Sequence, residues 1–91
     1  MLRLWVKLIR EGHLIKDLVV EETGEGNRTR KIKNAIDKAC MTFDLPRPLW
    51  LPSIVEEFRR YDKCRFTKDA FMESIPFDYM EIQVLESEVL T

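Results

Sequence analysis

One stretch of the sequence has a clear helical period, and it limits what the rest of the chain can form. Its apolar residues recur at intervals of three and four positions and are Ile32, Ala35, Ile36, Ala39, Cys40 and Phe43. This spacing places them on one face of an α-helix over about residues 28–43, with Asn27 as the candidate N-cap. A helix with a single apolar face must bury that face against a second layer of structure.

Two segments of alternating apolar and polar residues are the candidates for this second layer. Residues 2–10 alternate strictly, and Glu11 and Gly12 follow as a tight turn, so we expect a β-hairpin over about 2–20. The apolar residues of its second strand are clustered, which leaves room for a β-bulge. Residues 79–86 alternate in the same way and predict a C-terminal strand, followed by a frayed tail over 87–91.

The segment between the helix and this last strand contains two further elements. Ser53 and Glu56 have the spacing of a capping box, so we expect a second helix over about 53–62. Arg65 and Phe66 fit a short strand, and Thr67 fits the cap of a single turn. Together these elements predict a single two-layer α+β domain over residues 1–91, a mixed sheet with helices packed on one face.

The order of the elements resembles the ubiquitin-like β-grasp topology, in which a hairpin, a crossing helix and a returning strand share one sheet. This resemblance implies that the last strand lies beside the first and parallel to it. The sequence has no C-terminal Gly-Gly pair, so the resemblance implies no role in conjugation. A different two-layer α+β arrangement stays open.

The C-terminal half carries a second resemblance. It contains Leu-Pro-Arg-Pro-Leu-Trp-Leu at 45–51, then Phe58, Arg65-Phe66 and Ile-Pro-Phe-Asp-Tyr at 75–79. In these residues it is similar to a family of small uncharacterised bacterial proteins of no assigned function. The similarity implies a bacterial, cytosolic protein and carries no functional residue over to this chain.

Charge and hydropathy exclude several classes of protein. The net charge of −1 excludes a histone-like polycation, although the middle of the chain is basic and its C-terminal third is acidic. Arg3, Lys7 and Arg10 interrupt the N-terminal apolar run, so we expect no signal peptide. No stretch approaches the ~20 apolar residues that a membrane helix needs. These features predict a cytoplasmic protein with reduced cysteines and no membrane partner.

Candidate catalytic groups are few, and each has a simpler interpretation. His13 lies at the expected hairpin turn, and Cys40 belongs to the apolar stripe of the first helix. Cys64 lies between Lys63 and Arg65, whose charges lower the thiol pKa if they face it. One histidine and two cysteines match no zinc spacing. We expect no catalytic residue, metal or cofactor, and an enzyme centred on Cys64 or His13 is only the third hypothesis.

Basic residues gather at two places in the expected helices. They are Arg28, Arg30, Lys31 and Lys33 in the first helix, and Arg59 and Arg60 in the second. Cations at a helix N-terminus oppose the helix dipole, so the first group is a candidate anion contact. Aromatic residues interleave with the second group, a pattern that favours base stacking. A weak nucleic-acid or phosphate binder is the alternative function, and two solvated helix faces are the simpler interpretation.

The segment 45–52 has seven apolar residues of eight, yet its three prolines exclude regular structure. A stiffened segment loses little entropy on binding, and Trp with Arg is typical of interface hot spots. The candidate partner contacts are Arg47, Leu49, Trp50 and Leu51. The simpler alternative is that Trp50 folds back and closes the core. The leading hypothesis is a small non-enzymatic interaction module that binds an unidentified protein or a second copy of itself.

Overall fold

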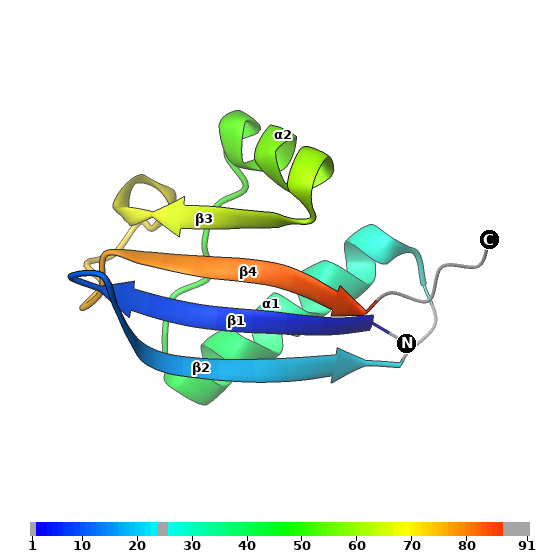
Figure 1. Cartoon of the computed structure of the whole chain (residues 1–91), viewed down its shortest axis with the longest axis horizontal. Coiled ribbons are helices and arrows are strands. Elements are labelled where there is room, and N and C mark those ends of the chain that lie inside the picture. The colour runs from blue at the N-terminus through cyan, green and yellow to red at the C-terminus, as the bar shows by residue number, and fades with distance from the viewer. Residues whose placement is uncertain (1, 24–25, 87–91) are drawn as a thin grey trace.

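The computed structural model describes residues 2–23 and 26–86 (Figure 1). Its elements, in chain order, are β1 (Leu2–Arg10), β2 (His13–Glu22), α1 (Arg28–Phe43), α2 (Pro52–Tyr61), β3 (Lys63–Thr67), the 3-10 turn η1 (Lys68–Ala70) and β4 (Tyr79–Glu86). The expected α+β class and the order of strands and helices are confirmed. The expected frayed tail, 87–91, lies outside the described residues.

The four strands form one sheet in the order β2-β1-β4-β3, and every neighbouring pair is antiparallel. The expected mixed sheet is therefore wrong, and so is the parallel pairing of first and last strands that the β-grasp resemblance implied. The reason is β3, which is a full strand running in the same direction as β1. The chain reverses once more between β3 and β4, so β4 enters between them antiparallel to both.

One hydrophobic core lies between the sheet and the helices. The strands contribute the buried side chains of Leu2, Leu4, Val6, Leu8, Val20, Cys64, Phe66, Met80 and Ile82. The stripe of α1 is buried as its spacing indicated: Ile32, Ala35, Ile36, Ala39 and Cys40. Ile54 and Phe58 of α2 join the same cluster. Figure 1 shows α1 crossing behind the sheet and α2 alongside β3, so the two helices cover different parts of the core.

The helix starts follow from local chemistry. The Asn27 side chain accepts a hydrogen bond of 2.9 Å from the Arg30 backbone N–H, which confirms the predicted N-cap of α1. The capping box at Ser53 is wrong, because Pro52 with its fixed φ already occupies the first turn of α2. Leu51 is the N-cap, and its carbonyl accepts from the backbone N–H groups of Ile54 and Val55.

The turn between β1 and β2 is held by a residue from the other end of the chain. Glu11 and Gly12 both have positive φ, at 52° and 77°, as a two-residue hairpin turn of this hand requires. The Asp78 carboxylate accepts a 2.7 Å hydrogen bond from the Glu11 N–H, and the Asp78 N–H donates to the Ile9 carbonyl at 2.8 Å. Next to the turn the register shifts between Leu8 and Ile9, so the bulge anticipated in this hairpin is present.

We expect Asp78→Ala to lower the free energy of unfolding by about 1 kcal/mol, because the turn loses its carboxylate acceptor. Asp69→Ala is the matched control, since Asp69 is an exposed carboxylate in η1. Urea titration followed by circular dichroism measures both. Equal effects of the two substitutions would contradict the role given to Asp78.

Candidate binding groove

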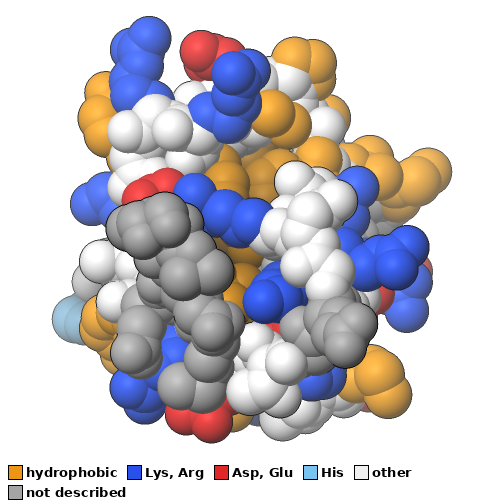
Figure 2. Space-filling view, turned by 90° about the vertical axis from the view of Figure 1, so that its right-hand side faces the viewer, with side chains coloured by type: hydrophobic (Ala, Val, Ile, Leu, Met, Phe, Trp, Pro, Cys, Tyr) orange, Lys and Arg blue, Asp and Glu red, His pale blue; other side chains and the backbone are white. Residues whose placement is uncertain are grey.

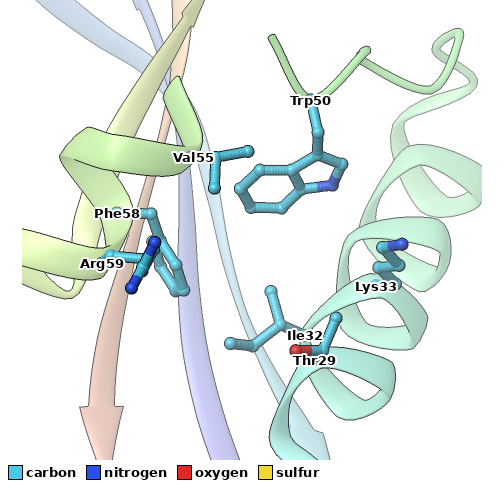
Figure 3. Close-up of a pocket in the computed structure, with 7 residues that line it drawn as sticks. All are labelled: Thr29, Ile32, Lys33, Trp50, Val55, Phe58 and Arg59. Carbon is cyan, nitrogen blue, oxygen red and sulfur yellow. The ribbon is translucent and has the colours of Figure 1, made fainter. Parts of the chain in front are cut away.

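A groove opens between α1 and α2, with a cavity volume of about 360 Å³. Its walls come from both helices and part of its floor from the proline-rich segment. The lining residues are Thr29, Ile32, Lys33, Trp50, Val55, Phe58 and Arg59. Figure 3 shows the Trp50 indole directed into the space between the helices, with Val55, Phe58 and Arg59 on the α2 side and Thr29, Ile32 and Lys33 on the α1 side. Most of the lining is apolar, and its charged members are both cations.

The position of Trp50 in the groove is fixed by aromatic contacts with the core. Its ring meets Phe58 and Phe66 edge-on, with centroid distances of 5.7 and 5.0 Å. Trp50 is half-buried and packs against the core, as the simpler alternative expected. The remaining part of the indole lines the groove, so it serves as core and as surface at the same time.

The segment around Trp50 is fixed to the body of the domain at several points. Pro48 is buried, and the Leu49 N–H donates to the Ala70 carbonyl at 2.7 Å. Pro52 then starts α2 directly after the segment. Because the prolines prevent 45–51 from forming a helix, the chain crosses between α1 and α2 without regular secondary structure.

Basic side chains from both helices meet at this groove. Lys33 and Arg59 line it from opposite sides, and neither belongs to an ion pair within residues 2–23 and 26–86. Arg28 lines an adjoining cavity that shares Thr29, Ile32, Phe58 and Arg59. Its guanidinium is paired with Asp62 at 2.6 Å and lies 5.7 Å from the Phe58 ring centroid, so its charge is already balanced.

Figure 2 shows the end of the molecule where α1 begins and α2 ends. Hydrophobic side chains lie recessed near the centre of this view, and Lys and Arg side chains gather around them. The view agrees with a groove that has an apolar floor and a cationic rim.

The structure divides the predicted contact residues. Of the basic group, it brings Arg28, Lys33 and Arg59 together, whereas Arg30, Lys31 and Arg60 do not line the groove. Of the proline-rich group, only Trp50 lines it. Arg47 pairs instead with Asp37 of α1 at 3.2 Å, Leu51 packs against the core, and Leu49 is exposed elsewhere on the segment.

Four lining residues were not predicted as contacts from the sequence: Thr29, Ile32, Val55 and Phe58. Val55 follows the buried Ile54, and it is partly exposed because the groove leaves this side of α2 uncovered. In the sequence, Ile54, Val55 and Phe58 recur at helical spacing and Ile32 belongs to the apolar stripe of α1, which was the available signal. Nothing in the local pattern marks Thr29, which faces the groove only because Trp50 lies opposite α1.

Both cysteine thiols are buried. Cys64 is buried, and burial, with Glu57 and Glu81 nearby, raises its thiol pKa to about 12. Lys63 and Arg65 do not meet the condition for lowering this pKa, because alternation along β3 turns their side chains to the opposite face. Burial, with Asp37 nearby, raises the pKa of the Cys40 thiol to about 11. His13 is exposed at the start of β2.

No group of three or more His, Cys, Asp or Glu side chains within the described part of the chain is arranged to hold a metal ion. No helix among these residues has the length and hydrophobicity needed to cross a membrane. In comparisons with known proteins, the chain matches no family model, no curated protein and no solved structure.

We expect both thiols to resist Ellman's reagent in the folded protein and to react fully in denaturant. The raised pKa values also make stability depend on pH. Below the ordinary thiol pKa of 9.0 both states are protonated, and above it only the unfolded state ionises. The free energy of unfolding therefore falls as the pH rises from about 9 towards 11.

Cys64→Ala removes one of the two buried thiols. The free energy of unfolding should then decrease less between about pH 9 and pH 11, which urea titration over this pH range measures. Fast modification of the folded protein, or an unchanged pH dependence in Cys64→Ala, would contradict the burial of Cys64 as the cause.

Proposed function

We propose that this chain is a small, non-enzymatic interaction module that binds an acidic segment of a partner protein in the groove between α1 and α2. One observation carries the proposal. The groove combines an apolar floor at Trp50, Ile32 and Phe58 with the cations of Lys33 and Arg59 on its two sides. On the sequence grounds given above, we place this binding in the cytoplasm.

The charges of the groove favour an acidic partner segment. A cavity of about 360 Å³ lies within the size range of ligand pockets, and it accepts one or two large apolar side chains. A segment that inserts such side chains and carries carboxylates beside them would meet Lys33 on one wall and Arg59 on the other. An amphipathic acidic helix presents both features on adjacent positions.

The groove is preorganised for binding. The Trp50 ring is fixed against Phe58 and Phe66, and its segment is stiffened by prolines, so little conformational entropy is lost on association. A rigid Trp beside an Arg is a common composition for the centre of an interface. These features support a binding role for the residues that line the groove.

The proposal predicts selective binding of an acidic amphipathic peptide. The probe is a fluorescein-labelled synthetic peptide with glutamates around a leucine and a phenylalanine, titrated by fluorescence anisotropy. Arg59→Glu weakens binding at least about tenfold, because it places a carboxylate against the peptide's own. Arg60→Glu is the matched control, with the same charge change on an exposed neighbour outside the groove, and it changes affinity less than about threefold.

Two altered peptides show which features of the ligand matter. Replacing its glutamates by lysines, or its leucine and phenylalanine by serines, abolishes binding if both rim and floor are used. Equal loss in Arg59→Glu and Arg60→Glu would overturn the site, since only the net charge would then matter. A labelled single-stranded oligonucleotide that binds more tightly than the acidic peptide would favour the nucleic-acid alternative instead. In that case Arg30→Glu would weaken oligonucleotide binding as much as Arg59→Glu does.

A further inference from the structure

The sheet has a second face, which points away from the helices. In Figure 1 no described element crosses in front of the strands. Alternate residues of β1 point to this face, and they are Arg3, Trp5, Lys7 and Ile9. All four are half-buried, although no second layer of the described chain covers them, because their neighbours on β2 and β4 pack beside them.

The register places one row of alternating charge across this face. Asp17 of β2 pairs with Lys7 of β1, Lys7 pairs with Glu81 of β4, and Glu81 pairs with Arg65 of β3. Directly opposed residues of antiparallel strands share a face, so the row reads acid, base, acid, base from one sheet edge to the other. Asp17 and Arg65 stand at its two ends, on strands that do not touch each other.

The rows on either side of this charge row are less polar. One contains Val19, Trp5, Gln83 and Lys63, and the other contains Leu14, Ile9, Tyr79 and Thr67. Large apolar or aromatic side chains thus occupy the central strand β1 on both sides of Lys7. This composition differs from the purely polar face that an open antiparallel sheet presents to water.

The side chains in these rows are held in place by one another. The Lys7 Nζ lies 4.0 Å from the Trp5 ring centroid, 3.3 Å from Gln83 Oε1 and 3.7 Å from Glu81 Oε1. The Trp5 indole N–H donates to Asp17 Oδ2 at 2.9 Å. The Arg65 guanidinium lies 4.8 Å from the Tyr79 ring centroid. Ordered side chains lose less entropy when a partner covers them.

We propose that this face binds a second copy of the chain, with the two sheets packed face to face. The two-fold axis runs parallel to the strands between β1 and β4. In this arrangement Asp17 faces Arg65 of the partner subunit, and Lys7 faces Glu81 of the partner subunit. Rotation about this axis reverses the order of the row, so every acid meets a base and the surface is complementary to itself.

The neighbouring rows are compatible with the same axis. Ile9 faces Tyr79 of the partner subunit, and Trp5 faces Gln83 of the partner subunit. Sheets packed in this way keep their strands roughly aligned, as in β-sandwiches. A nucleic acid is a poorer occupant, because the Asp17 and Glu81 carboxylates lie in the same row as the cations and repel phosphate.

A charge-exchange experiment tests this pairing. Asp17→Arg places two arginines opposite each other, and Arg65→Asp places two aspartates opposite each other, so each variant alone has a dimer dissociation constant at least about tenfold higher than the unsubstituted chain. In an equimolar mixture of the two variants each arginine faces an aspartate, and the dimer returns. Sedimentation velocity over a range of concentrations measures all three samples.

Lys16→Glu is the matched control, because Lys16 is exposed on β2 next to Asp17 but pairs with the buried Leu8 on the opposite face of the sheet. It leaves the dimer unchanged. Restoration by mixing cannot come from misfolded variants, and circular dichroism checks each fold. A chain that stays monomeric at every concentration, or two variants that remain monomeric when mixed, would overturn the proposal. Peptide binding in the groove is measured separately and is expected to be unaffected by these variants.

Discussion

The edge-on packing of the Trp50 indole against Phe58 and Phe66 is the contact on which the rest of the domain depends. It links the proline-rich segment to α2 through Phe58 and to the sheet through Phe66, whose side chain is fully buried. This contact adds to the packing of α2 at the β3 edge, where Ile54 and Phe58 are buried in the same core. With it, the core extends beyond α1 to a second helix in a chain of 91 residues.

The same contact explains why Trp50 is partly buried in the core and partly exposed in the groove. The prolines keep the segment out of both helices, so the Trp50 ring lies between α1 and α2 and part of it stays accessible there. Lys33 and Arg59 then border an apolar surface that no other described element covers. The two functional hypotheses raised by the sequence, a tryptophan contact and a basic contact, therefore describe neighbouring parts of one groove.

Local patterns predicted the elements well, because periodicity and capping act within a few residues. The stripe of α1 and its Asn27 cap are examples. The direction of β4 could not be read in this way, since it depends on whether Arg65 and Phe66 belong to a full strand. Likewise Arg59 and Arg60 look equivalent in the sequence, yet a helix turns about 100° per residue, and only Arg59 lines the groove. Which cations face Trp50 is fixed by the packing of α2, and that is a tertiary property.

Nuclear Overhauser spectroscopy of the free protein tests the central claim most directly, because it reports proton distances around the Trp50 indole. The account predicts cross-peaks from the indole ring to the ring protons of both Phe58 and Phe66 in the same spectrum. Cross-peaks to neither phenylalanine would contradict it, since the tryptophan would then not pack against the core and the groove between α1 and α2 would lack the indole that lines it.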